Sequence, residues 1–309
     1  MKYKDWLREW LDNYVEPTSK SRTSSVYKIL AEKHIISVLG EYELDEITAP
    51  ILQHYITDLL QRGNLKTGKG LAANSVNAII NVIQNSMKTA YRLGYIKQNC
   101  AEKIIRPKTQ EKKITCFSVV EQKKIEQAVL SDKREKMLGI LLCLYTGLRI
   151  GEVLALTWAD VDFKNGLLNV SKSCHDGIGG NGNYIRIEDT PKTVSSIRTI
   201  PLPKQIIPIL KNAKKKSRFE HIVSNGENVL SVRSYQRTFE LLLKRLNIPH
   251  KGFHALRHTF ATRALECGMD VKTLSEIMGH RSPTITLNRY VHSMLDHKRE
   301  MMNKIGKML

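Results

Sequence analysis

Residues 105–114 divide the chain into two parts. Their sequence, Ile-Arg-Pro-Lys-Thr-Gln-Glu-Lys-Lys-Ile, has no apolar period and contains one proline and three lysines. A segment without an apolar face does not join a hydrophobic core, and proline interrupts regular structure. We therefore predict two domains, residues 1–106 and 115–309, joined by a linker at residues 107–114.

The first part of the chain has the pattern of a helical domain. Apolar residues recur at helical spacing after Trp6, Val26, Ile51 and Val76, which predicts four helices. The fourth helix has a second face of short polar and basic side chains, suited to phosphates and base edges. An ordinary solvated face has the same composition, and this helix alone does not distinguish the two. The candidate DNA-contact residues are Lys69, Ser75, Asn77, Asn81, Lys88 and Arg92.

The second part of the chain mixes two periods. Helical spacing continues to Tyr145 and resumes at Ile150, after a break at residues 146–149. Three segments with alternating apolar residues then predict three strands of one small antiparallel sheet: 167–171, 184–187 and 197–201. Five further helices follow, at 208–217, 232–246, 253–267, 271–278 and 282–291, and the tail at 295–309 is amphipathic. The predicted fold is mainly α with a small antiparallel β-sheet, an all-helical domain followed by an α+β domain.

The charge of the chain favours a polyanionic partner. Formal net charge is +19, from 49 Lys and Arg against 30 Asp and Glu, and the pI is near 9.7. Residues 107–309 carry most of it, with 34 basic and 19 acidic residues. Such an excess makes nucleic acid the first candidate partner.

Cysteine usage and hydropathy indicate a cytoplasmic protein without a membrane partner. The five cysteines are odd in number and form no C-x-x-C pair, which argues against a disulfide framework or a zinc module. The longest apolar run, near residues 137–145, is too short to span a bilayer.

Three local patterns suggest other functions, and each lacks a necessary part. The G-x-G-x-x-G at residues 177–182 precedes a strand pattern rather than a helix, so a hairpin connection is the better interpretation. The segment 63–69 is similar to a phosphate-binding loop but is followed by Gly70 instead of Ser or Thr. His254 and His258 have a zinc spacing, but Ala255 stands where H-E-x-x-H requires glutamate.

Five motifs in a fixed order remain. They are Thr146-Gly-Leu-Arg149-Ile-Gly-Glu152, Pro191-Lys192-Thr193 with Arg198-Thr-Ile-Pro201, His254-Ala-Leu-Arg257, Gly279-His280 and Tyr290. In these motifs and their order the chain resembles the tyrosine recombinase (phage integrase) family over most of residues 115–292. The helices of residues 1–106 look like that family's SAM-like core-site DNA-binding domain, which makes residues 115–309 the catalytic domain.

The resemblance implies a catalytic set of Arg149, Lys192, His254, Arg257, His280 and Tyr290. Phosphoryl transfer concentrates negative charge on phosphate oxygens, and a guanidinium stays charged and binds two oxygens at once. By resemblance, Arg149 and Arg257 clamp the phosphate, and Tyr290 is the nucleophile. Lys192, in the turn before the last strand, is the general acid for the leaving 5′-oxygen.

The resemblance also implies the supporting groups. His254 accepts the tyrosine proton or binds the phosphate, and His280 donates to a phosphate oxygen. Glu152 orients the site rather than reacting. The two arginines take the place of the metal ions that many nucleases use, so we expect no metal and no other cofactor.

The implied function is site-specific DNA recombination through a covalent 3′-phosphotyrosine, integrating and excising a mobile element of prophage or conjugative-transposon type. The implied partners are core recombination sites on double-stranded DNA and a homo-tetramer on that DNA. The segment at about 295–309 is expected to be a helix exchanged between protomers. An accessory excision factor or a DNA-bending protein is a further candidate partner.

Two alternatives stay open. A Xer-type chromosome or plasmid dimer resolvase has the same chemistry, and the length of the chain favours that type, which has no separate arm-binding domain. The sequence around residues 74–95 and 277–292 favours the integrases instead. The other alternative is a catalytically inactive DNA-binding protein, against which the complete set of six residues argues.

Overall fold

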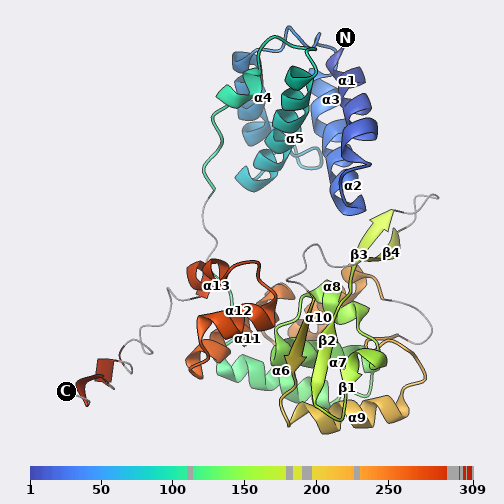
Figure 1. Cartoon of the computed structure of the whole chain (residues 1–309), viewed down its shortest axis with the longest axis vertical. Helices are drawn as coiled ribbons and strands as arrows, with labels where there is room; N and C mark the ends of the chain where they lie inside the picture. The colour runs from blue at the N-terminus through green and yellow to red at the C-terminus, as the bar shows by residue number, and fades with distance from the viewer. Residues whose placement is uncertain are drawn as a thin grey trace. The chain divides into compact units, whose positions relative to one another are not determined.

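Buried apolar side chains form two large clusters that share no residue. They are the cores of two compact units, Met1–Lys112 (unit 1) and Lys113–Leu309 (unit 2), as Figure 1 shows. The boundary between the units falls inside the segment predicted as the linker. Helices dominate both units, and short antiparallel strands occur in unit 2, as the sequence predicts.

A computed structural model of the chain describes residues 1–109, 114–178, 184–189, 197–225 and 230–290, together with residues 299, 302–303 and 305–307. Within these residues no helix has the length and apolar character needed to cross a membrane. Most of the predicted protomer-exchange helix at 295–309 lies outside the described residues.

Unit 1 follows the four predicted helical segments, with two differences. The first two segments each pass from an α-helix into a π-helical turn, and the second segment continues into a short α-helix before Gly40. The elements are α1 (Tyr3–Trp10), η1 (Leu11–Val15), α2 (Ser21–Leu30), η2 (Ala31–Ile35), α3 (Ile36–Leu39), α4 (Ala49–Arg62), α5 (Ala73–Arg92) and η3 (Cys100–Lys103).

The core of unit 1 is built around α5. Three aromatic residues of α1 turn toward this helix, and each also makes a polar contact with it. Tyr3 Oη lies 3.0 Å from Ser86 Oγ, and Trp6 Nε1 donates to the Ser86 carbonyl at 3.2 Å. Trp10 Nε1 donates to Thr89 Oγ1 at 3.1 Å. The buried aromatic rings therefore have partners for their polar atoms, which fixes α1 against α5.

Unit 2 begins with helices that the sequence marks clearly. Ser118 and Glu121 form the predicted capping box at the start of α6. The apolar run in α7 is buried on all sides, as its composition predicts. The first elements are α6 (Val119–Ser131), η4 (Glu135–Met137), α7 (Leu138–Thr146), α8 (Ile150–Ala155) and η5 (Trp158–Asp160). The later helices are α9 (Ile206–Lys216), α10 (Val232–Arg245), α11 (His254–Glu266), α12 (Val271–Met278) and α13 (Pro283–Tyr290).

The strands form two sheets, and the prediction of one sheet is wrong. β1 (Val161–Asp162), β2 (Leu167–Val170) and β5 (Arg198–Pro201) form a three-stranded antiparallel sheet in the order β1-β2-β5. β3 (Ser173–Ile178) and β4 (Tyr184–Asp189) pair separately. The sequence of β3, Ser-Cys-His-Asp-Gly-Ile, lacks apolar alternation, so it gives no strand signal and its partner β4 is misassigned. The G-x-G-x-x-G pattern thus spans the connection of an antiparallel pair.

Close packing around α7 depends on a residue without a side chain. A Cβ placed on Gly139 would lie 2.5 Å from Tyr235 Oη, 2.6 Å from a Val153 methyl and 2.7 Å from a Val223 methyl. α7 therefore approaches α8 and α10 more closely than any other residue type at this position permits.

We expect Gly139→Ala to destabilise unit 2 by about 2 kcal/mol. Overpacking typically costs more than the helix propensity that alanine adds. Gly252→Ala is the matched control, because nothing lies within 4 Å of its Cβ position, and its effect should stay within about 0.5 kcal/mol. Denaturant unfolding measures both variants, and equal stabilities would contradict this packing.

Candidate active site

The break between α7 and α8 positions the first motif. α7 ends at Thr146, and the left-handed φ of 66° at its C-cap residue, Gly147, turns the chain. Arg149 is the N-cap residue of α8, and its backbone N–H donates to Glu152 Oε2 at 2.9 Å. The same carboxylate accepts from Arg149 Nη1 at 2.7 Å. The Arg149 side chain is 36% exposed, so one end of the ion pair reaches solvent.

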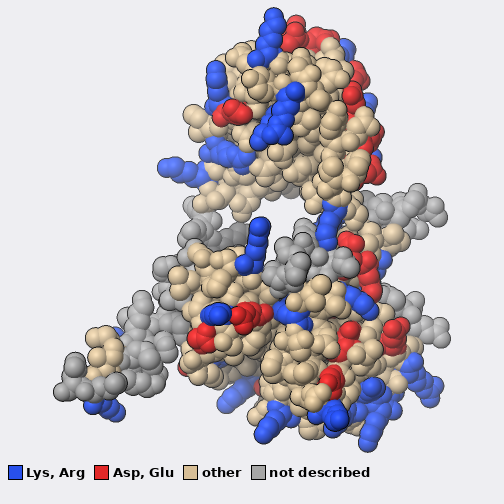
Figure 2. Space-filling view, in the orientation of Figure 1, with Lys and Arg blue, Asp and Glu red and all other residues tan. Residues whose placement is uncertain are grey.

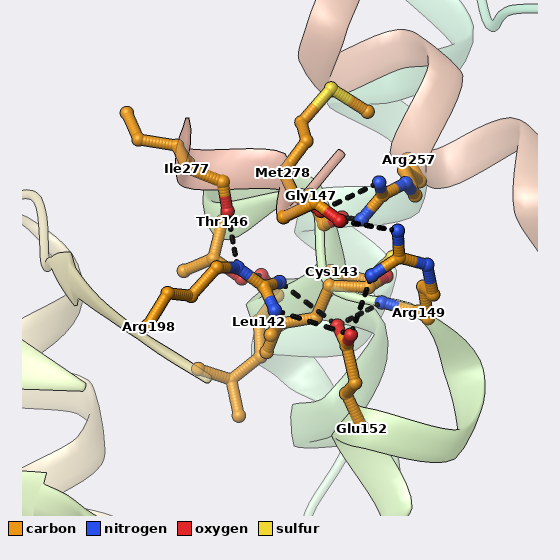
Figure 3. Close-up of polar contacts among 12 residues, drawn as sticks. Leu142, Cys143, Thr146, Gly147, Arg149, Glu152, Arg198, Arg257, Ile277 and Met278 are labelled. Atoms are coloured by element: carbon orange, nitrogen blue, oxygen red, sulfur yellow. Dashed lines mark hydrogen bonds and ion pairs between the residues drawn. The ribbon is translucent and has the colours of Figure 1, made fainter. Parts of the chain in front are cut away.

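Three arginines converge on the C-terminal end of α12. Each donates to one of three successive backbone carbonyls (Figure 3). The pairs are Arg198 Nε with Ile277 O at 2.6 Å, Arg257 Nη2 with Met278 O at 2.8 Å, and Arg149 Nη2 with Gly279 O at 2.9 Å. The last carbonyls of a helix have no partner within the helix and form the negative end of its dipole. Three guanidinium groups therefore satisfy and neutralise this helix end.

Arg257 also ties the helix end to the break before α8. Its Nη1 donates to Gly147 O at 2.7 Å, so one guanidinium bridges α12 and the α7–α8 junction. The residue is only 1% exposed. Arg149 and Arg257, 108 positions apart in the chain, thus lie at one place.

Glu152 is the buried carboxylate of this cluster. It is 3% exposed and lies between Arg149 and Arg198, whose Nη2 donates to Oε2 at 2.9 Å. Burial alone raises the pKa of Glu152, but the hydrogen bonds and charge of Arg198, together with Arg149, outweigh burial and lower the pKa below its ordinary value. Glu152 therefore stays ionised in the folded chain.

His280 follows directly after the three carbonyls. Its backbone N–H donates to Ser275 O at 3.0 Å, and its Nδ1 lies 2.7 Å from the hydroxyl of the buried Thr286 in α13. This contact fixes which ring nitrogen faces α13. α13 ends at Tyr290, so the helix that orients His280 also carries the proposed nucleophile at its last position.

The other predicted residues differ in how far the structure places them. His254 opens α11 as an exposed residue and packs edge-to-face on His258, with 4.5 Å between the ring centroids. Lys192 lies outside the described residues, between β4 and β5. The backbone of Tyr290 is described, but its side chain is not. The described residues hold no group of three or more His, Cys, Asp or Glu side chains suited to a metal ion.

Arg198 is the member of the cluster that sequence reasoning missed as a site residue. Its strand alternates, so Arg198 shares the inner face of β5 with the buried Ile200. A cation on the inner face of a strand requires a buried partner. The alternation of the Arg198-Thr-Ile-Pro201 motif therefore indicates that Arg198 binds a buried anionic group. The partner is Glu152.

The predicted DNA-contact residues of unit 1 divide into two groups. Asn77 and Asn81 bind the segment after η3: Asn77 Nδ2 donates to Pro107 O at 3.1 Å, and Asn81 Oδ1 accepts from Arg106 at 2.8 Å. The remaining four residues are exposed: Lys69, Ser75, Lys88 and Arg92. Arg106 is itself exposed and adds a cation to the same face of α5.

The charge of unit 1 is unevenly distributed. Residues 47–106 contain eight Lys and Arg against two Asp and Glu, whereas residues 1–46 contain seven against nine. Figure 2 shows the acidic side chains gathered over the α1–α3 side of this unit. The half containing α4 and α5 is therefore the basic half, the side suited to a polyanion.

We expect Glu152→Gln to lower the free energy of unfolding by about 3 kcal/mol at pH 7, because it leaves the buried Arg198 guanidinium without its counter-charge. A lowered pKa means that ionised Glu152 stabilises the fold above its ordinary value of 4.5 and that this stabilisation is lost as the pH falls below that value. The two proteins should therefore converge in acid. Denaturant unfolding across pH measures this difference.

The control for this substitution is Glu240→Gln, which breaks the exposed pairs of Glu240 with Arg237 and His250. Its effect should stay below about 1 kcal/mol at every pH. If Glu152→Gln changes the free energy of unfolding as little as the control does, the role assigned to the buried carboxylate is contradicted.

Comparison with known proteins identifies the two units. A family model described as "Phage integrase family" matches residues 117–297, and one described as "Phage integrase, N-terminal SAM-like domain" matches residues 2–60. The chain is 33% identical to a tyrosine recombinase XerC-like protein of Caldanaerobacter subterraneus subsp. tengcongensis, over 93% of this chain and 78% of that protein. It is 30% identical to the transposase from transposon Tn916 of Enterococcus faecalis, over 74% of this chain and 62% of the transposase.

The fold agrees with a solved structure. The Tn1549 transposon integrase in complex with a circular intermediate DNA superposes with a TM-score of 0.81 at 23% identity, over 98% of this chain and 99% of that one. Together, the paired arginines at the end of α12 and the family models over both units show that this chain belongs to the phage integrase family, the tyrosine recombinases.

Proposed function

We propose that the chain is a site-specific DNA recombinase that integrates and excises a mobile genetic element through a covalent 3′-phosphotyrosine. The observation that carries this proposal is the convergence of Arg149 and Arg257 beside His280, at the base of the helix that ends with Tyr290. A phosphate at this place would meet two permanent cations and a histidine, the groups that stabilise a phosphoryl-transfer transition state.

The reaction conserves the energy of the DNA backbone. The Tyr290 hydroxyl oxygen attacks the scissile phosphorus, and the bond from phosphorus to the 5′-oxygen breaks. Lys192 donates a proton to the leaving 5′-oxygen, and His254 takes the proton of the tyrosine. Reversal of these steps by a different 5′-hydroxyl rejoins the strands.

Arg149 and Arg257 differ in how far their side chains are exposed to DNA. A guanidinium has five N–H donors, so the bond from Arg149 Nη2 to Gly279 O leaves Arg149 able to contact phosphate oxygens. Arg149 is partly exposed, whereas Arg257 is almost completely buried. DNA can reach Arg149 directly, and contact with Arg257 requires a rearrangement when DNA binds.

The proposed partners are double-stranded core recombination sites and three further copies of the chain. Structures with this fold include a lambda integrase tetramer bound to a Holliday junction, at 22% identity and a TM-score of 0.68. We place the protein in the cytoplasm, associated with DNA. The basic charge of the α4–α5 half of unit 1 supports DNA binding by the exposed side chains of α5.

A dimer resolvase of the Xer type is the second candidate, favoured by the 33% identity to the XerC-like recombinase. The Tn916 transposase and the ICEBs1 integrase of Bacillus subtilis, 24% identical, favour a mobile element. A strand-exchange assay separates the two functions. Recombination between the two ends of a mobile element that carries this gene supports the integrase. Recombination only at a chromosomal dimer-resolution site supports the resolvase.

We expect Tyr290→Phe to bind core-site DNA and to form no covalent adduct, because it lacks only the nucleophilic oxygen. The measurement uses a nicked suicide DNA substrate and a denaturing gel that resolves the protein–DNA adduct. Tyr145→Phe, in the same unit, is the matched control and should form the adduct. An undiminished adduct with Tyr290→Phe would refute the assignment of the nucleophile.

We expect the double variant Lys88→Ala/Arg92→Ala to weaken DNA binding and to reduce the slope of log K against log salt by about 2, since each phosphate contact contributes about 1. Lys2→Ala is the control, because Lys2 is paired with Glu41 on the acidic side of unit 1. Titrations at several salt concentrations measure both. Equal slopes for the double variant and the control would contradict a DNA-binding face on α5.

A further inference from the structure

Arg198 contacts two parts of the active-site cluster, the Glu152 carboxylate and the C-terminal end of α12. Its Nη1 and Nη2 bind the two carboxylate oxygens of Glu152 at 3.2 and 2.9 Å, and its Nε donates to Ile277 O at 2.6 Å (Figure 3). A planar guanidinium suits this two-oxygen contact, whereas an ammonium does not. Arg198 thus joins β5, α8 and α12 at one point.

The position of Arg198 excludes direct contact with DNA in this conformation. Its side chain is 7% exposed, whereas the Arg149 side chain on the opposite side of Glu152 is 36% exposed. Arg198 therefore acts on the reaction through the groups that it holds. Two such groups are the Glu152 carboxylate, which sets the position of Arg149, and the end of α12, which leads into His280.

The turn at Gly279 shows how closely Arg198 supports this segment. Gly279 has a φ of 61°, and a Cβ at this residue would lie 3.0–3.2 Å from atoms of the Arg198 side chain. The backbone just before His280 therefore lies directly against the arginine. A shift of Arg198 must move this turn and the histidine that follows it.

We propose that Arg198 is a positioning residue for DNA cleavage: it holds Glu152 against Arg149 and fixes the end of α12 beneath His280. This role presupposes the recombinase activity proposed above. Because the catalytic groups must be placed to within a fraction of an ångström, loss of Arg198 slows the chemical step and leaves DNA binding intact.

The test compares Arg198→Gln and Arg198→Lys in the full chain by single-turnover adduct formation on the nicked suicide substrate. We expect Arg198→Gln to slow adduct formation by about 10- to 100-fold, because small displacements cost this much, while the Kd for DNA changes less than about twofold. Arg198→Lys keeps the charge but loses the two-oxygen contact, so its rate should fall between those of Arg198→Gln and the native chain.

A pH profile separates positioning from general loss of structure. Glu152 is faced by Arg198 from β5, Arg149 from the α7–α8 junction and the buried Cys143 thiol from α7. Arg198→Gln removes the strongest interactions that lower the pKa of Glu152, while the burial that raises it remains. As the pH decreases, the rate of Arg198→Gln should therefore begin to fall at a higher pH than the native rate does. Arg198→Lys and the double variant Arg198→Gln/Glu152→Gln should both lack this acid limb.

Arg186→Gln is the matched control. Arg186 has the same 7% side-chain exposure and also binds a backbone carbonyl, Leu154 O at 2.8 Å, and a carboxylate, Glu188. It binds neither Glu152 nor an α12 carbonyl, so the pH profile of Arg186→Gln should match that of the native chain.

Four outcomes decide the inference. A native rate and pH profile in Arg198→Gln would overturn it, as would an Arg198→Lys variant with the full native rate. If Arg198→Gln does not fold, a folded Arg198→Lys variant with a reduced rate and native DNA affinity supports the inference, and a parallel loss of affinity overturns it. No adduct from the native chain would refute the proposed recombinase activity itself.

Discussion

The C-terminal end of α12 is the point on which the site depends. Three successive carbonyls there accept hydrogen bonds from Arg198, Arg257 and Arg149, which come from a strand, a helix and a helix break far apart in the chain. Glu152 holds two of these cations together in a buried setting. The negative end of a helix and one carboxylate thus keep three positive charges at one place before any phosphate arrives. This is preorganisation: the electrostatic cost of assembling the cations is met during folding rather than during the reaction.

Most of the fold could be predicted from the sequence because local patterns decide it. Apolar periods mark the helices, the capping box of Ser118 and Glu121 marks the start of α6, and the apolar α7 is buried as its composition requires. The sheets could not be assigned correctly, because the pairing of β3 with β4 depends on a strand that lacks apolar alternation. Strand pairing is a long-range property, and the alternation of one strand does not specify its partner.

The site was partly predictable, because local motifs mark some of its residues and long-range contacts bring in the others. Motifs fixed in order identified Arg149 and Arg257, and the structure brings both to the end of α12. The structure also reveals what motifs do not state: that Arg198 completes the cluster, and that Asn77 and Asn81 hold the segment after η3. These contacts join residues more than 20 positions apart, so only the folded chain displays them.

The central claim is that this cluster binds the scissile DNA phosphate where the Tyr290 hydroxyl attacks it. Mass spectrometry of the trypsin-digested adduct formed on a nicked core-site substrate tests the claim most directly. Cleavage after Arg289 and Lys298 isolates residues 290–298, in which Tyr290 is the one tyrosine. We predict that the nucleotide is attached to Tyr290 through its 3′-phosphate. Attachment to a different peptide, or through a 5′-phosphate, would contradict the account.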